Sequence, residues 1–216
     1  PMVRRLTAED MVVWLVTTRP VELTLKVWPG RAENASESSE MQLSSSDSES
    51  CQSIQIGQHA FIRILHLTFE QPIIDQTRLE YDVLIEIEQE SSGLRTTIPD
   101  LLLPDKSRPE VIFKQKVDSL LHGSCRKPHH QSRDALARVD QLLLEAPLEK
   151  RPALLMMAGD QIYADDVAGP MLVAIHQIIE LLGLNTEKLD GALVEDGEAL
   201  FCLLYTSDAA DEVVSV

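Results

Sequence analysis

The chain has 216 residues, of which 44% are hydrophobic, and its formal net charge at pH 7 is −16. This length allows one large domain or two small ones, with enough apolar residues for a real core. The acidic balance argues against nucleic acid as a partner, because a phosphate backbone attracts basic surfaces. No apolar run reaches the roughly 20 residues of a membrane-spanning helix, so we expect no transmembrane segment.

Cysteine usage and the N-terminus bear on the compartment. The three cysteines show no paired spacing, which argues against a disulfide framework and favours a reducing compartment such as the cytoplasm. No signal peptide is visible, but the chain begins at Pro1 rather than at an initiating methionine. A leader could therefore precede the printed sequence, so export stays open. The sequence does not indicate an oligomeric state.

The first half of the chain has the pattern of β-strands. Four segments are apolar and β-branched or alternate apolar with polar side chains, the period of a half-buried strand: residues 11–16, 21–27, 60–69 and 78–88. Turns separate them and no helical pattern intervenes, so we expect an antiparallel β-sandwich over residues 1–108. Residues 31–53 are rich in serine and acidic side chains and are expected to form a long flexible loop.

The pattern changes near Pro109, where regularly spaced prolines predict an extended linker and a domain boundary. Strands and helices then alternate through residues 109–200. Strands are expected over residues 117–122 and 153–158, the second apolar throughout, as in a strand buried on both faces. Helices are expected over residues 134–144, with Ser132 as N-cap, and over residues 170–182. The second helix has an apolar stripe that should be buried: Met171, Leu172, Ile175, Ile178, Ile179 and Leu182.

Side chains suited to a metal ion follow both predicted strands. The first strand leads into "GSCRKPHH", which contains Cys125, and the second into "GDQIYADD", which contains Asp160 and Tyr163. Because functional loops gather beyond the carboxyl ends of parallel strands, these three side chains should converge if the strands are neighbours. A thiol and a phenol lose their protons readily beside a strong positive charge. The pattern therefore predicts a site for one or two divalent or trivalent cations.

The same loops carry further polar candidates. Arg126, Lys127, His129 and His130 form a basic island in an acidic chain, and we expect Arg126 and His129 to contact an anionic substrate. Asp165 and Asp166 could support the metal ligands or bind calcium themselves, although acidic residues also favour the start of a helix. The pattern assigns no residue a direct catalytic role.

These motifs resemble a known enzyme family. The Gly-Asp-x-x-Tyr pattern of "GDQIY" is similar to that of purple-acid-phosphatase-like metallophosphoesterases, and together with "GSCRKPHH" it resembles the PhoD-like, or alkaline phosphatase D, family. The resemblance implies a multidomain α+β chain with an N-terminal antiparallel β-sandwich and a four-layer α/β/β/α metallophosphoesterase domain, of which residues 109–200 would be the first part. It also implies Fe³⁺ and Ca²⁺ as cofactors and Cys125, Asp160 and Tyr163 as metal ligands.

The implied activity is hydrolysis of phosphate monoesters or diesters by a metal-activated hydroxide. The family's later ligands, an Asn-His pair and further His and Asp residues, do not occur before the sequence ends. Residues 202–212, "CLLYTSDAADE", resemble a translated sequencing adapter, although a natural acidic tail is the alternative. We therefore expect residues 201–216 to be an artefactual tail, the chain to be a fragment truncated at both ends, and its active site to be incomplete and inactive.

Two other functions remain open. The chain could be a β-sandwich binding or interaction module with a degenerate α/β appendage. It could also be a different α/β hydrolase or nucleotide binder in which Asp160 holds magnesium. The downstream coding sequence and the identity of the bound metal would separate the three.

Overall fold

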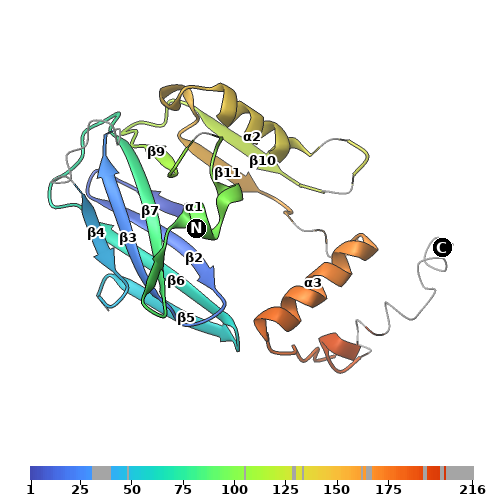
Figure 1. The fold of residues 1–216 in the computed structure, drawn as a ribbon. Helices are drawn as coiled ribbons and strands as arrows, with labels where there is room; N and C mark the ends of the chain where they lie inside the picture. The colour runs from blue at the N-terminus through green and yellow to red at the C-terminus, as the bar shows by residue number, and fades with distance from the viewer. Residues whose placement is uncertain are drawn as a thin grey trace.

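The first part of the chain forms two antiparallel sheets (Figure 1). The computed structural model describes residues 1–30, 40–47, 49–104, 106–127, 130–132, 134–161, 163, 167–191, 194–199 and 202. The first sheet has the order β1 (Met2–Leu6), β2 (Asp10–Thr17), β6 (Ala60–Thr68) and β5 (Cys51–Gly57). The second has β4 (Met41–Ser44), β3 (Glu22–Pro29) and β7 (Arg78–Ile87), with β8 (Glu90–Ser92) and β9 (Glu110–Ile112) both paired to β7.

One apolar core lies between these sheets. Alternate residues of each central strand point into it, so Val13 of β2, Leu25 of β3 and Val83 of β7 are fully buried. Each buried aliphatic side chain of this kind contributes roughly 1.5–3 kcal/mol. The expected sandwich strands at β2, β3, β6 and β7 are confirmed. In β3 and β7 the apolar residues of the alternating pattern are the buried ones, whereas β2 is apolar on both faces and Arg63 of β6 is itself buried.

Two expectations about the sandwich are wrong. The segment 31–53 is not one long loop, because residues 41–44 form β4 against β3 and residues 51–57 form β5 against β6. The boundary also lies later than residue 108, because β9 pairs with β7 and Phe113 is buried. The proline-rich segment before β9 contains α1 (Leu94–Thr97) and a short 3-10 helix, η2 (Pro99–Leu101), rather than only extended chain.

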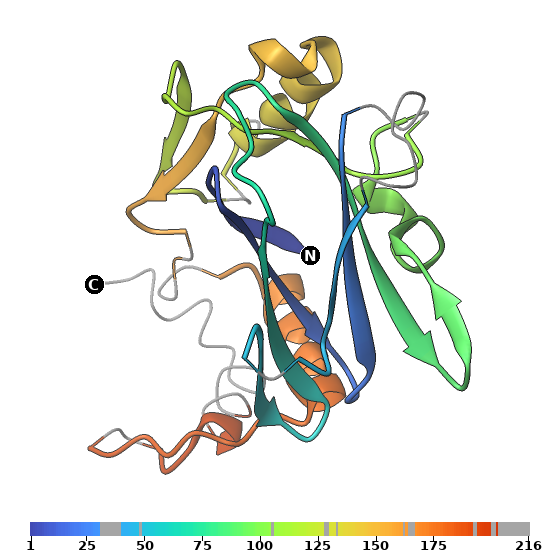
Figure 2. The same ribbon diagram turned by 90° about the vertical axis from the view of Figure 1, so that its left-hand side faces the viewer.

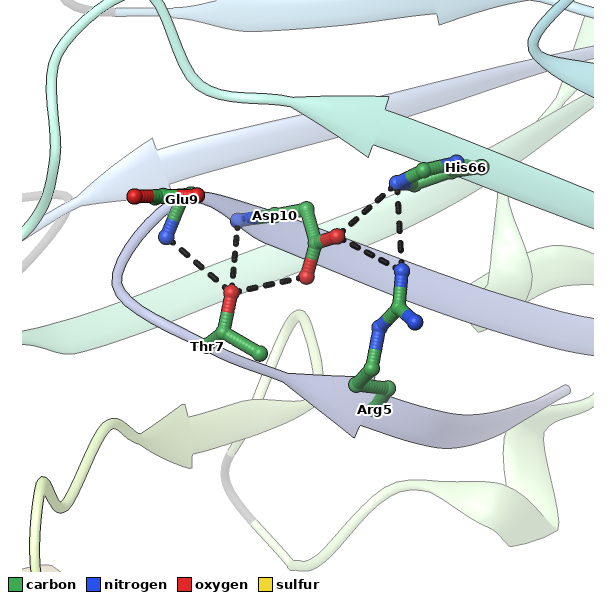
Figure 3. Close-up of polar contacts among 5 residues, drawn as sticks. All are labelled: Arg5, Thr7, Glu9, Asp10 and His66. Carbon is green, nitrogen blue, oxygen red and sulfur yellow. Dashed lines mark hydrogen bonds and ion pairs between the residues drawn. The ribbon is translucent and has the colours of Figure 1, made fainter.

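The outer face of the first sheet carries a polar cluster around Asp10 (Figure 3). Asp10 Oδ2 accepts hydrogen bonds from Arg5 at 2.6 Å and from His66 Nε2 at 2.9 Å, and its Oδ1 accepts one from the Thr7 hydroxyl at 2.8 Å. Thr7 Oγ1 in turn accepts the backbone N–H groups of Glu9 and Asp10. One carboxylate thus ties β1, the β1–β2 turn and β6 together.

The second part begins with a parallel pair of strands, β10 (Leu120–Ser124) and β11 (Leu154–Ala158). Between them run α2 (Ala135–Glu145) and the 3-10 helix η3 (Leu148–Lys150), and α3 (Gly169–Leu182) follows β11. The strand expected over residues 117–122 instead spans Leu120–Ser124, so it ends directly before Cys125. The N-cap of α2 is Asp134 rather than Ser132, because Asp134 Oδ1 accepts the N–H of Leu136 at 3.0 Å. Among the described helices, none has the length and apolar character to span a membrane.

The burial expected for this second part is not found. All five residues of β11 are exposed, although the strand is apolar throughout. No residue of α3 is buried, and Met171 and Ile178 of the predicted stripe are 48% and 52% exposed. The sequence patterns for buried elements are present, but within the described part of the chain no layer covers them.

Among the described residues, contacts at two places join the two parts. Leu148 of η3 is buried, and the next residue, Glu149, forms an ion pair with Arg78 of β7. Farther along, the turn between β5 and β6 meets the C-terminal end of α3 (Figures 1 and 2). There the backbone N–H groups of Gln58 and His59 donate to the carbonyls of Gly183 and Leu182, at 2.9 and 2.8 Å. These bonds satisfy carbonyls that a helix end leaves without partners.

A cation–π contact holds the segment before β9 on the sandwich. The guanidinium of Arg108 lies 3.8 Å from the ring centroid of Trp28, and Trp28 Nε1 donates to Glu40 at 3.0 Å. The carbonyl of Pro109 also accepts the N–H of Tyr81. The segment immediately before β9 is therefore attached to β3 and β7.

Candidate metal centre

The ends of β10 and β11 lie side by side, as the sequence pattern requires. The two strands are parallel and in register, with Ser124 opposite Ala158, which confirms that the two motif loops start at the same edge. Cys125 has φ 54° and Gly159 has φ 70°, so the chain takes a left-handed turn immediately after each strand. The N–H of Arg126 donates to the carbonyl of Asp160 at 2.8 Å, which joins the two loops directly.

Gly159 allows this close approach. A Cβ at that position would lie 2.4 Å from Ser124 Oγ and 3.2 Å from Cys125 Sγ. Any side chain would therefore push the two loops apart, and its positive φ would add strain in any residue with a Cβ. The glycine keeps the carboxylate-bearing loop against the thiol-bearing loop.

The thiol of Cys125 lies at the centre of the contacts between the loops. Its pKa is lowered, first by the hydrogen bond from Ser124, whose Oγ is 3.3 Å away, and then by hydrogen bonds from the Tyr163 side chain and the Asp160 backbone. Desolvation and the negative charge of Asp160 act in the opposite direction. The favoured thiolate is both the form that binds metals and the form that reacts with electrophiles.

The structure thus brings together the three residues predicted as metal ligands. Cys125 contacts Tyr163 and the backbone of Asp160, and the Asp160 carboxylate is close enough to act on the Cys125 pKa. Among the described residues, however, no group of three or more His, Cys, Asp or Glu side chains is arranged to hold an ion. The carboxylate, thiolate and phenolate of these residues form a donor set that suits a transition-metal ion.

Arg126 has a different environment from the one predicted for a substrate contact. Its Nε and Nη2 donate to Asp134 Oδ2 at 3.1 and 2.6 Å, a two-pronged ion pair at the start of α2. This hydrogen bonding raises the pKa of Arg126 and lowers that of Asp134. Sequence reasoning missed Asp134, although aspartate is a preferred N-cap and so marks the helix start. The other predicted positions, His129, Asp165 and Asp166, lie outside the described residues.

A cavity of about 700 Å³ opens beside the thiol, between the β10–β11 pair and α2. Leu121, Val139, Leu155 and Met157 supply apolar walls, whereas polar and basic side chains line the end near the motif loops: His122, Ser124, Cys125, Arg126, Lys127, His130, Ser132, Asp134 and Tyr163. Ser124 was not among the predicted site residues, and His130 was predicted only as a member of the basic island. Their contributions depend on hydrogen bonds across a turn, and such bonds leave no periodic pattern in the sequence.

Comparison with models of protein families and with curated proteins found no match.

Proposed function

We propose that this chain carries part of a metal-dependent phosphatase or phosphodiesterase, with Cys125, Asp160 and Tyr163 as ligands of ferric iron or of a paired iron–calcium centre. The observation that carries the proposal is the direct contact between the two loops that follow β10 and β11. These loops bring a thiol of lowered pKa, a carboxylate and a phenol to one edge of the sheet. The motif resemblance supports the same three residues.

The protein groups have separable roles in this proposal. Hydrogen bonds from Ser124 and the backbone of Asp160 lower the pKa of Cys125 and so favour the thiolate, the form needed for metal binding. Arg126 fixes the start of α2 through Asp134 and so shapes the cavity beside the thiol. When bound, the cations would act as Lewis acids and lower the pKa of water, which would make a hydroxide nucleophile available at neutral pH. The cavity would then admit the ester beside them.

We also propose that β10, β11, α2 and α3 belong to a larger layered α/β domain of the metallophosphoesterase type. Parallel strands occur almost only in sheets that are covered on both faces. The apolar residues of β11 and α3 are exposed in the described part of the chain, which supports a further covering layer. Further metal ligands are expected from residues outside the three described here, because catalytic ions commonly take four or more ligands.

Titration of the purified chain with Fe³⁺ tests the metal proposal without requiring turnover. We expect a visible tyrosinate-to-iron absorption band that disappears in Tyr163→Phe and weakens in Cys125→Ser and Asp160→Asn. Tyr81→Phe is the matched control, since Tyr81 lies buried in the sandwich core, and it should keep the band. A band that survives in Tyr163→Phe, or binding of magnesium with no uptake of iron, would reject these three residues as an iron site.

Hydrolysis is tested separately with chromogenic phosphate monoesters and diesters, on the chain and on any longer protein that contains it. We expect metal-dependent turnover in the form that holds the complete metal site, and its loss in Asp160→Asn. Turnover that is indifferent to chelators would contradict it.

A further inference from the structure

His130 lines the cavity and has one ring nitrogen fixed by a neighbouring residue. The backbone N–H of Ser132 donates to His130 Nδ1 at 3.1 Å, and the Ser132 hydroxyl lies 2.8 Å from the same nitrogen. A backbone amide can only donate, so Nδ1 must present its lone pair. The neutral imidazole then carries its proton on Nε2.

This tautomer sets what the ring can offer to a ligand. We propose that His130 is a binding residue of the cavity and donates a hydrogen bond from Nε2–H to a phosphate oxygen. The identity of the ligand as a phosphate ester depends on the proposed function, whereas the direction of the hydrogen bond follows from the contact between Ser132 and His130. A metal ligand would need a bare nitrogen, and ligating histidines normally donate their other N–H to an acceptor. His130 has the opposite arrangement.

Lys127 supplies positive charge at this end of the cavity, whereas the Asp160 carboxylate, which acts on the Cys125 thiol, opposes an anion. His130 shares the lining with Lys127 and His122, in a chain whose overall charge is strongly negative. The nearby carboxylate of Asp134 forms an ion pair with Arg126, and this pair uses part of the Arg126 guanidinium. Arg126 Nε and Nη2 are therefore taken up in positioning α2, and His130 offers a further donor to an oxyanion in the cavity. Hydrogen bonds between a neutral donor and a charged acceptor are stronger than neutral ones.

Long-range ¹H–¹⁵N correlation NMR on histidine-labelled chain tests the tautomer directly. At about pH 8, where an ordinary histidine is neutral, we expect His130 to show the Nε2–H pattern, assigned by its loss in His130→Ala. Ser132→Ala should keep this pattern, because the backbone N–H remains. A dominant Nδ1–H pattern in the wild-type chain would overturn the proposal.

The ligand is tested by titrating inorganic phosphate into the chain with a chelator present, against sodium chloride of equal ionic strength. We expect phosphate to shift His130 Nε2, and His130→Ala to weaken phosphate binding about tenfold. His130→Gln, which places an amide N–H near the position of Nε2, should recover most of the affinity. Equal phosphate binding by all three proteins would overturn the proposal. Because no metal is present, this outcome is independent of whether Cys125, Asp160 and Tyr163 bind iron.

Discussion

Asp134 makes two contacts at once: it caps the first turn of α2 and it forms a two-pronged ion pair with Arg126. The backbone of Arg126 is bonded to Asp160 in the other motif loop. The start of α2 is therefore linked to both loops of the candidate metal centre through a single arginine.

Substitutions at Asp134 separate these two contacts. Asp134→Asn keeps a good N-cap but removes the charge, whereas Asp134→Ala removes both. We expect the thermal unfolding midpoint to be highest for the wild type, lower for Asp134→Asn and lowest for Asp134→Ala. The pKa of Asp134 is lowered in the folded protein, so the ion pair contributes fully above the ordinary value of 3.8 and is lost as the pH falls below it. The difference between wild type and Asp134→Asn should therefore shrink on acidification, as followed by circular dichroism.

The contacts around Cys125 predict unequal reactivity of the cysteines. The pKa of Cys125 is lowered by Ser124 and Tyr163, whereas burial and Asp47 raise that of Cys51. Because the thiolate is the reactive form, Cys125 should be alkylated at a lower pH than Cys51. Peptide mass spectrometry after iodoacetamide treatment across a pH series measures this.

Gly159→Ala should reduce that difference between the cysteines. The added Cβ would clash with Ser124 Oγ and displace the loop that holds the thiol, so the pKa of Cys125 should return toward its ordinary value. Gly169→Ala is the control, because a Cβ at Gly169 meets nothing within 4 Å. An unchanged alkylation profile in Gly159→Ala would show that the loop contacts do not set the reactivity.

The cluster at Asp10 predicts an acid-sensitive contribution to the sandwich. Burial acts to raise the pKa of Asp10, but hydrogen bonds from Thr7, His66 and Arg5 outweigh it and leave the pKa below 3.8. A lowered folded pKa gives stability that is present above the unfolded value and lost as pH falls through the folded one. Asp10→Asn should therefore be less stable than wild type at pH 6, with the gap closing below pH 4. Glu9→Gln, which keeps the backbone bond to Thr7, should follow the wild type in urea unfolding.

Tyr81 predicts a loss of stability at high pH. Burial, with a smaller effect of Asp82, raises its pKa from 10.0 to about 12. The unfolded chain ionises this phenol first, so stability is complete below pH 10 and declines as the pH rises toward 12. A pKa gap of that size corresponds to about 3 kcal/mol. The denaturant midpoint of Tyr81→Phe should equal that of the wild type near pH 7 and exceed it at pH 11–12. Parallel curves for the two proteins over this range would contradict the assignment.

The contact between the C-terminal end of α3 and the β5–β6 turn depends on two glycines, Gly57 and Gly183. Gly183 has φ 57°, and a Cβ there would lie 2.7 Å from Gln58 Cβ; a Cβ at Gly57 would lie 2.6 Å from the carbonyl oxygen of Leu182. Left-handed backbone costs a residue with a side chain about 1–2 kcal/mol. Gly183→Ala and Gly57→Ala should each speed hydrogen exchange of the Gln58 and His59 amides. Gly169→Ala, at the opposite end of α3, should leave these amides unchanged.

The sequence predicts the strands that have one buried face. In β3, Leu23, Leu25 and Val27 alternate with polar residues, and the period alone indicates which face meets the core. β4 was missed because its four residues lie in a serine-rich segment, where composition favours a loop, and pairing with β3 decides the outcome. The apolar run of β11 predicts a strand correctly, but a run without alternation cannot show what covers it.

The candidate site also has one part that the sequence predicts and another that it does not. The convergence of Cys125 and Asp160 follows from a general property of parallel strands, so spacing and strand order were enough to predict it. The pairing of Arg126 with Asp134, and the fixed nitrogen of His130, depend on the path of a loop in three dimensions. No local pattern encodes that path, so the sequence predicts a substrate contact for Arg126 but not its ion pair with Asp134.

The attachment of β9 to β7 changes where the sandwich can be separated from the rest of the molecule. A chain cut after residue 108 would lose the strand that covers Leu79 and its neighbours and would expose backbone groups along the edge of β7. It would also remove Phe113, whose N–H and carbonyl are bonded to Thr77 and Gln76. The β-sandwich is thus completed by residues that follow the proline-rich segment, and a self-sufficient N-terminal half has to include them.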